Sequence, residues 1–311
     1  RTLKRQKKIQ EWEQRIKLLY QKYPRLAEID RLYKQMAMDL ALLGLGKNRM
    51  DMSAEELEQA LNSLREEKKR ILESQGISEK VFEVWWDCPK CQDLGYLSPG
   101  VKCSCLLKEE EESRLSRSGL APEQRKQTFE NFSLHYYAEP QKYKAILETC
   151  RTFAYRVSAG EKVPNLVLTG PVGTGKTHLS SAIANHVLAA GKAVLYIKIV
   201  RLLDLLREVK FQDKDFDNDL WQYITQVDLL IIDDLGTETL TDFAGEQILN
   251  ILDERINYHL PFVLNTNLSP TELDAHYELR LVDRITGTSK FLVFSGDSIR
   301  QRKFIQLNAQ E

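Results

Sequence analysis

The chain has 311 residues, of which 44 are Lys or Arg and 45 are Asp or Glu, and 42% of them are hydrophobic. This length allows two domains and a large buried core, and the apolar content excludes a disordered chain. The formal net charge of -1 excludes a histone-like polycation, so any contact with nucleic acid must come from a local basic surface. No apolar run approaches the ~20 residues that span a bilayer. The basic N-terminus leads into a charged amphipathic stretch, which is not a signal sequence, so we expect a cytoplasmic protein without membrane contact.

Residues 1–80 form the first predicted region, and their pattern is helical. Apolar residues recur every three or four positions over 9–23 and again over 26–43. A third helix is predicted to begin after Ser53, because Ser53 and Glu56 have the spacing of a capping box. The narrow apolar stripes must pack on one another or on a partner. A small helical bundle and a partner-binding region both fit this pattern.

Residues 81–115 contain a cysteine cluster, which we predict to be a small metal-binding module. Cys88 and Cys91 are separated by two residues, and Cys103 and Cys105 by one. Four thiolates in two such pairs can surround one ion as a tetrahedron, and Zn²⁺ is the metal that suits them. A redox pair and an iron–sulfur centre are the alternatives. The aromatic residues expected to pack around this site are Trp85, Trp86 and Tyr96.

Residues 161–311 alternate short β-branched runs with helical patterns, after a linker and helix over 116–160. This alternation is typical of a parallel sheet that is covered by helices on both faces. The predicted strands are 165–169, 193–198, 228–233, 262–265 and 290–294. The predicted helices are 177–190, 200–209, 242–258 and 270–275. The fold class is therefore α/β, with five parallel strands.

A phosphate-binding loop follows the first of these strands. Its sequence, Gly170-Pro-Val-Gly173-Thr174-Gly175-Lys176-Thr177, matches the P-loop pattern in full, with a strand before it and an amphipathic helix after it. Glycines let the backbone N–H groups turn inward around a polyphosphate. Lys176 is expected to offset the phosphate charge, and the Thr177 hydroxyl to hold Mg²⁺. We include His178, at the start of the helix, among the nucleotide-binding residues.

Two further strands end in polar residues that belong to the same chemistry. Asp233 and Asp234 follow a buried strand, and we expect Asp233 to support the Mg²⁺ shell and Asp234 to polarise the attacking water. The next strand ends in Asn265-Thr266-Asn267, an amide cluster suited to orienting that water. The chain has no Asn-Lys-x-Asp guanine-reading sequence, so ATP is preferred to GTP. Candidates for neutralising the γ-phosphate are Arg280, Arg284, Arg300 and Arg302.

These residues resemble a known family. The runs GPVGTGKTHLSSAIANHVL, LLIIDDLG, NTNLS and LVDRI…GDSIRQR are similar to those of the bacterial helicase-loader AAA+ ATPases of the DnaC/DnaI type, relatives of DnaA and IstB. The segment CPKCQDLGY…CSC is similar to the cysteine cluster that precedes the ATPase in many loader-like proteins. The resemblance covers roughly residues 85 to 305.

The resemblance implies roles for individual residues. Lys176 and Thr177 would be Walker A, and Asp233 and Asp234 Walker B. Asn267 would be sensor 1 and Arg300 sensor 2. Arg280 would be the arginine finger that acts on a neighbouring subunit's ATP, with Arg284 as the alternative. The second Walker B acid is Asp where many AAA+ proteins have Glu, so we expect slow, partner-stimulated hydrolysis. We also expect no helical lid after the last strand.

The family further implies a homo-oligomer that holds single-stranded DNA in its central channel. Basic and aromatic residues of the stretch 200–227 are candidates for that contact, because such pairs can stack on bases while following the backbone; a solvated loop is the alternative. These candidates are Arg201, Arg207, Lys210, Phe211 and Lys214, with Phe243 farther along. Phe129 and Phe132 are candidates for covering the adenine, with core packing as the alternative.

The leading functional hypothesis is an ATP-dependent loader of the replicative DNA helicase, in which residues 1–115 bind the helicase. A second hypothesis is an IstB-like transposition or phage-replication ATPase. A third, of a different class, is a zinc-containing adaptor in which ATP is only a structural ligand.

Overall fold

The computed structural model describes residues 1–44, 52–211 and 218–302, and it divides the chain into two compact units, Arg1–Leu107 and Lys108–Glu311. Within the described residues, no helix is long and apolar enough to cross a membrane. The boundary between the units does not test the four regions predicted from the sequence, which stay predictions.

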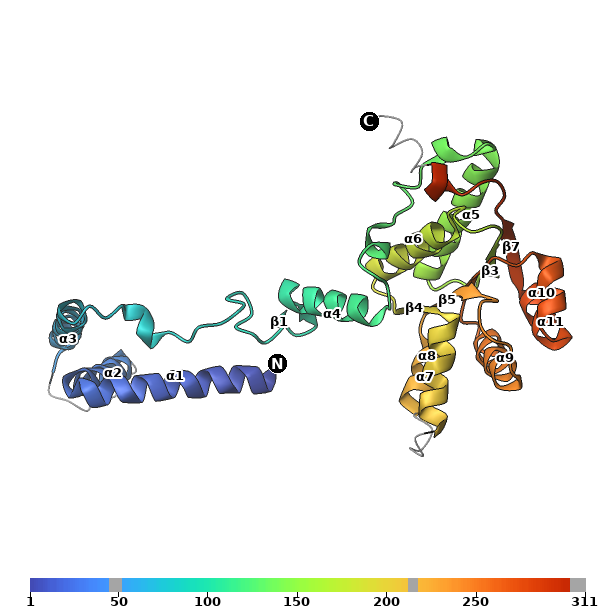
Figure 1. Ribbon diagram of the computed structural model, residues 1–311. Coiled ribbons are helices and arrows are strands. Elements are labelled where there is room, and N and C mark those ends of the chain that lie inside the picture. Colours follow the sequence, from blue (N-terminus) through green and yellow to red (C-terminus); the bar gives the residue numbers. More distant parts are fainter. Residues whose placement is uncertain (45–51, 212–217, 303–311) are drawn as a thin grey trace. The chain divides into compact units, whose positions relative to one another are not determined.

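The first unit is helical, followed by a short hairpin (Figure 1). Its helices are α1 (Thr2–Lys22), α2 (Pro24–Gly44), α3 (Ala54–Ser74) and the 3-10 helix η1 (Glu79–Phe82). The hairpin is β1 (Tyr96–Ser98) paired with β2 (Val101–Lys102), and α4 (Ser104–Arg117) follows it into the second unit. The capping box at the start of α3 is confirmed, since the Ser53 side chain accepts from the Glu56 N–H and the Glu56 carboxylate from the Ser53 N–H.

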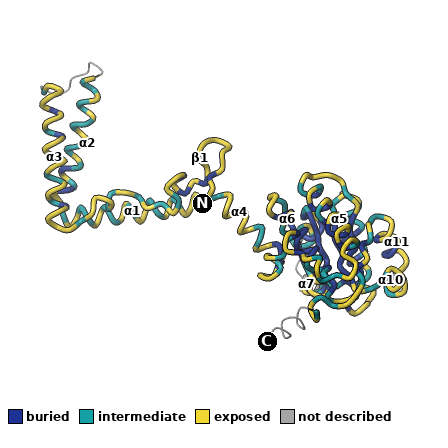
Figure 2. Tube along the Cα trace, turned by 90° about the horizontal axis from the view of Figure 1, so that it is seen from above, coloured by how far each residue is buried: buried dark blue, intermediate teal, exposed yellow. Residues whose placement is uncertain are grey.

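α2 and α3 pack side by side, whereas α1 buries no residue completely (Figure 2). Leu26 and Ile29 of α2 and Leu57 and Leu72 of α3 are 2% exposed or less. α1 contacts α2 through the Tyr20 hydroxyl, which donates to Asp30 Oδ2 at 2.6 Å, and it contacts the segment after α3 through the Trp12 indole, which donates to the Phe82 carbonyl oxygen at 3.1 Å. The three predicted helices are therefore present, and only two of them share a buried stripe.

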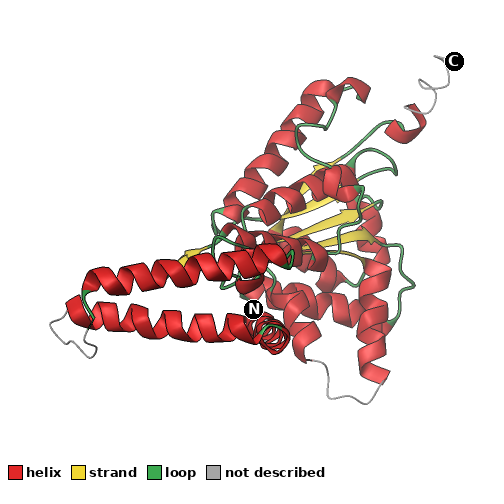
Figure 3. Ribbon diagram, turned by 90° about the vertical axis from the view of Figure 1, so that its left-hand side faces the viewer, coloured by secondary structure: helices red, strands yellow, loops and turns green. Residues whose placement is uncertain are grey.

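The second unit is a three-layer α/β domain, with a five-stranded parallel sheet between helices (Figure 3). Its strands are β3 (Asn165–Thr169), β4 (Val194–Lys198), β5 (Leu229–Leu235), β6 (Phe262–Thr266) and β7 (Ser289–Val293), in the order β4-β5-β6-β3-β7. Its helices after α4 are α5 (Pro140–Ser158), α6 (Lys176–Ala189), α7 (Ile199–Phe211), α8 (Asn218–Gln226), α9 (Asp242–Asn257), α10 (Pro270–His276) and α11 (Leu279–Thr288), with 3-10 helices η2 (Gln124–Lys126) and η3 (Leu134–Tyr136). The predicted fold class is confirmed.

Each face of the sheet has its own apolar core. Along β3, Leu166 and Leu168 pack toward α5 and α6, while Val167 packs toward α7, α8, α9 and α11. Side chains alternate between the two faces along a strand, so strands that are buried on both faces need apolar residues at successive positions. The stretch 200–227, for which a solvated loop was the alternative, contains α7 and α8, and Ile224 of α8 is completely buried.

The edge strand β4 is covered by the chain that precedes α5. The Tyr196 N–H donates to the Ser118 carbonyl oxygen at 2.7 Å. Gly119 has a φ of +74°, and a Cβ there would overlap with the Tyr196 carbonyl oxygen. Only glycine fits at this close approach.

After β7, the described part of the chain contains only a short helical segment at 299–302, so no lid domain follows the sheet in the described residues. This segment lies against the P-loop, since the Ile299 N–H donates to the Gly173 carbonyl oxygen at 2.9 Å.

Candidate nucleotide-binding site

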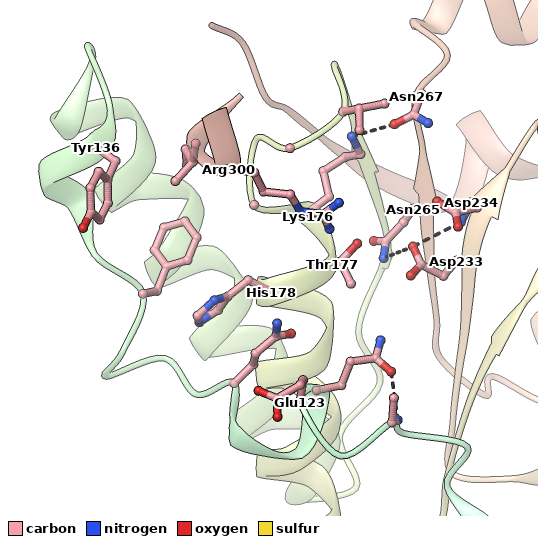
Figure 4. Close-up of a pocket in the computed structure, with 18 of the residues that line it drawn as sticks. Glu123, Tyr136, Lys176, Thr177, His178, Asp233, Asp234, Asn265, Asn267 and Arg300 are labelled. Carbon is pink, nitrogen blue, oxygen red and sulfur yellow. Dashed lines mark hydrogen bonds between the residues drawn. The ribbon is translucent and has the colours of Figure 1, made fainter. Parts of the chain in front are cut away.

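A pocket of about 580 Å³ opens at the carboxyl edge of the sheet (Figure 4). This volume is within the range of small-molecule sites. The P-loop, α6 and the strand ends contribute Val172, Gly173, Gly175, Lys176, Thr177, His178, Lys198, Asp233, Asp234, Asn265, Thr266 and Asn267. The segments before α5 and after β7 contribute Ala121, Glu123, Gln124, Gln127, Asn131, Phe132, Ser133, Tyr136, Tyr137, Ile299 and Arg300. Ligands of open α/β sheets bind at this edge.

The P-loop has the backbone that its glycines predict. Gly173 and Gly175 have φ values of +80° and +100°, and Gly175 is the N-cap of α6. A Cβ on Gly175 would overlap with the Tyr137 hydroxyl, which donates to the Thr174 carbonyl oxygen at 2.9 Å. Thr174 is 1% exposed and its hydroxyl donates to the Pro171 carbonyl oxygen. Hydrogen bonds on the outer side of the loop thus fix its backbone. The N–H groups at the N-terminus of α6 remain available to bind an anion.

Lys176 is 7% exposed and its ammonium is held inside the loop. Nζ donates to the carbonyl oxygens of Gly170 and Pro171 at 2.5 and 2.8 Å, and to Asn267 Oδ1 at 2.9 Å. Burial lowers the pKa of Lys176 to about 8, against the opposing effect of Asp233 and Asp234. The three oxygens that accept from this ammonium are neutral, so its positive charge remains available to a polyphosphate bound in the loop.

Asp233 is 3% exposed and both of its carboxylate oxygens accept hydrogen bonds. Tyr196 Oη donates to Oδ2 at 2.6 Å, and Asn265 Nδ2 donates to Oδ1 at 2.8 Å. Asn265 Nδ2 also donates to the Ser180 hydroxyl at 2.7 Å. Tyr196 and Ser180 were not among the predicted site residues, because the sequence does not show that β4 pairs with β5 or that α6 brings Ser180 to Asn265.

Asp234 has a different environment from that of Asp233. It has a φ of +59°, and Lys198, at the end of β4, donates to its Oδ2 at 2.8 Å. This hydrogen bond raises the pKa of Lys198. Lys198 lines the pocket and was not predicted either, because nothing in the sequence says that β4 lies next to β5.

The predicted arginines separate into two groups. Arg300 lines the pocket, and Arg302 donates to the Tyr136 carbonyl oxygen and pairs with Asp297. Arg280 and Arg284 lie elsewhere, on α11, and both contact Asp253 of α9, at 3.8 and 2.7 Å. Arg280 and Arg284 therefore do not line this chain's own pocket.

The remaining aromatic and basic candidates are distributed as follows. Phe129 and Phe132 are 5% and 7% exposed and belong to the same core, and Phe132 also lines the pocket, where its ring is T-shaped to that of His178. The Arg207 guanidinium lies over the Phe243 ring at 5.7 Å. Lys214 lies outside the described residues, as do the side chains of Lys210 and Phe211.

In the first unit, Cys88, Cys91, Cys103 and Cys105 have their Sγ atoms all within 4.8 Å of one another. The closest pairs, Cys91–Cys105 and Cys88–Cys103, are 3.4 and 3.7 Å apart. Four thiolates at tetrahedral zinc distances are about 3.8 Å apart, so the donor set fits this metal. Hydrogen bonds lower the pKa of Cys103 to about 6.

The module is held by an acidic residue at its turn and by α1. Asp93, at a φ of +61°, accepts from the Cys88 N–H at 2.7 Å and from the Lys8 ammonium at 2.9 Å. The prediction that Trp85 packs around the cysteine site is wrong, because its side chain is 67% exposed and lies beneath the Arg15 guanidinium. Tyr96 is also exposed.

Comparison with known proteins identifies the family. The family described as IstB-like ATP binding protein matches residues 103–306. The replicative helicase loader DnaC of Escherichia coli strain K12 is 29% identical over 188 residues, covering 60% of this chain and 74% of that protein. DnaC of Buchnera aphidicola subsp. Schizaphis graminum is 30% identical over 192 residues, with the same coverage.

Among solved structures, AMPPCP-bound DnaA from Aquifex aeolicus matches with a TM-score of 0.50 and 23% identity, covering 61% of this chain and 57% of that one, and supports the fold alone. With its P-loop pocket, its sheet order and a family match over most of its length, the chain belongs to the IstB-like ATP-binding proteins, a family of AAA+ ATPases.

Proposed function

We propose that this protein is an ATP-dependent loader of the replicative DNA helicase and acts in the cytoplasm. The observation that carries the proposal is the combination of a complete P-loop pocket with 29–30% identity to replicative helicase loaders over the unit that contains it.

We assign the following roles to the residues that line the pocket. Lys176 exchanges its loop carbonyl partners for phosphate oxygens, and the N-terminus of α6 adds its dipole to the same charge. Thr177 and Asp233 would hold Mg²⁺, which would supply positive charge beside the phosphates. Asn267 and Asp234 orient and polarise the lytic water, and Arg300 contacts the nucleotide from the C-terminal segment.

Asp234→Asn tests this assignment directly. The variant keeps the shape of the side chain and removes its capacity to accept a proton, so ATP binding should be retained while turnover falls about 10²-fold or more. Turnover at the unaltered rate would remove Asp234 from the mechanism.

The four-cysteine module holds Zn²⁺ as a structural ion, and with α1–α3 it forms the helicase-binding part. Two features support this. The hairpin exposes Tyr96, Leu97 and Val101 at 47–56%, and no residue of α1 is completely buried in the part of the chain that the structure describes. Exposed apolar residues concentrated in a small module are typical of a partner surface.

Assembly completes the site. Arg280 is 70% exposed on its side chain and lies on α11, outside its own pocket. We propose that it reaches the ATP of a neighbouring copy in a homo-oligomer that encloses single-stranded DNA, and that ATP hydrolysis switches this oligomer.

Affinity capture with and without ATP is the decisive experiment. Capture of a hexameric helicase, together with ATPase activity that changes on adding single-stranded DNA, is expected. Absence of both would reject the loader.

A second candidate is a transposition ATPase, favoured by the description of the matching family as IstB-like. Capture of a transposase instead of a helicase would decide for it. An adaptor that uses ATP only structurally would keep its function in the Lys176→Ala variant.

A further inference from the structure

A buried carboxylate lies in the loop that follows Asp234. Glu238 is 7% exposed. Its Oε2 accepts from the Gly236 N–H at 2.8 Å, and its Oε1 accepts from the Tyr277 hydroxyl. A carboxylate is retained in such a place only when hydrogen bonds replace water, and here one donor comes from its own loop and the other from a distant segment.

The distant segment leads directly into the helix that carries the two arginines. Tyr277 is 6% exposed and precedes Glu278, the N-cap of α11. Burial and the contact with Glu238 raise the pKa of Tyr277, so its hydroxyl remains a donor at neutral pH. Farther along α11, Arg284 Nε lies 2.7 Å from Asp253 Oδ1.

The loop at the other end of this contact is itself fixed. The Thr237 N–H and hydroxyl both donate to the Asp234 carbonyl oxygen, at 3.1 and 2.8 Å. The Thr266 hydroxyl donates to the Leu235 carbonyl oxygen at 2.7 Å. Hydrogen bonds therefore fix the loop from Asp234 to Glu238, and a further hydrogen bond joins Glu238 to Tyr277.

We propose that Glu238 and Tyr277 are positioning residues, which set helix α11 and its arginines relative to the loop behind Asp234. The inference rests on the proposed action of Arg280 on a neighbouring subunit. The first residue of α11, Leu279, is 83% exposed, whereas Tyr277, two residues earlier, is buried. Apolar packing of α11 on the core begins only at Leu281. A directional hydrogen bond specifies one orientation of the helix, which apolar packing alone does less well.

The test separates the subunit that supplies the arginines from the one that supplies ATP. Full-length donor chains carry Lys176→Ala and cannot use their own site. Full-length acceptor chains carry Arg280→Ala and Arg284→Ala. Each is inactive alone, and mixing them with ATP and single-stranded DNA should restore turnover at the mixed sites.

Tyr277→Phe is then added to one chain at a time. In the donor it should lower the restored turnover about five-fold or more, which corresponds to roughly 1 kcal/mol. In the acceptor it should lower turnover less, because that chain's own arginines are already absent. Glu238→Ala in the donor should act in the same direction, and combining it with Tyr277→Phe should add little, since each substitution removes one partner of the same hydrogen bond.

The matched control is Tyr258→Phe, which removes a hydroxyl from a side chain that is 66% exposed at the end of α9. It should change neither mixture. Equal losses from Tyr277→Phe in donor and acceptor, or no loss in either, would overturn the positioning role alone. A mixture of unmodified donor and acceptor that recovers no turnover would instead reject the proposed trans action, and the positioning role with it.

Discussion

Lys198 Nζ lies 2.8 Å from Asp234 Oδ2, at the ends of two neighbouring strands. The residue proposed to polarise the lytic water is thus paired with a cation, which competes with water for the same carboxylate oxygen. The pair is partly exposed, so its strength is modest and a phosphate or a change of rotamer can release it.

Replacing Lys198 should therefore raise the basal rate. We expect Lys198→Gln to increase kcat for ATP about two- to ten-fold with little change in KM, because Asp234 becomes free to contact water. Steady-state kinetics without DNA measure this. Lys192→Gln is the matched control, since Lys192 pairs with Asp228 at 3.8 Å and does not line the pocket. A decrease in kcat would mean that Lys198 supplies charge to the phosphates.

ATP affinity should depend on pH through Lys176. Burial lowers the pKa of this side chain to about 8, and phosphate stabilises its charged form. Below pH 8 the ammonium is already present; above it, binding must take up a proton, so affinity should fall as pH rises from 8 toward 10, by up to about ten-fold per pH unit. The same linkage means that the lowered pKa weakens folding below pH 8, where Lys176 must be buried as a cation, and that this cost disappears as pH rises toward 10.5.

Equilibrium binding of a nucleotide analogue across this pH range measures the effect. Lys176→Arg is the control, because a guanidinium stays charged throughout. An identical pH profile in the variant would assign the dependence to another group.

Tyr196→Phe should destabilise the second unit. It leaves Asp233 Oδ2 without its 2.6 Å donor in a buried position, which costs about 1–3 kcal/mol in the free energy of unfolding. It should also raise the Mg²⁺ concentration needed for half-maximal turnover, because the carboxylate loses its orientation. Urea unfolding and a Mg²⁺ titration test both effects. Tyr155→Phe, at a residue that is 67% exposed, should be neutral, and equal behaviour of the two variants would contradict the assignment.

Removal of zinc should affect the first unit and spare the ATP site. Cys103→Ser is expected to abolish stoichiometric zinc, measured by elemental analysis, and to loosen the contacts between α1 and the module. ATP affinity should remain unchanged, since the pocket is lined only by residues from Ala121 onward. Cys150→Ala, at a buried cysteine in the core of the other unit, should retain zinc. Zinc retained by Cys103→Ser would reject the four-thiolate site.

The sequence was most informative where function depends on local chemistry. The P-loop, the acidic strand end and the cysteine pairs could be recognised because their residues are close in the chain, and β3 spans the predicted residues 165–169. Contacts that depend on sheet order could not be predicted. Lys198 meets Asp234 only because β4 pairs with β5. Glu238 meets Tyr277 only because β6 lies beside β5, so the segments that follow these two strands come together. The helix α8 was not predicted, because its few apolar residues follow a stretch rich in aspartate.

Ser118 and Gly119 cover part of the edge strand β4. The unpaired backbone groups of an uncovered edge strand can pair with another chain. Here the Tyr196 N–H donates to the Ser118 carbonyl oxygen, so this group is not available to another chain. The same hydrogen bond joins the segment that follows α4 to the sheet. The chain that follows α4 is therefore bonded directly to the strand that carries Tyr196 and Lys198, the two side chains that donate hydrogen bonds to Asp233 and Asp234.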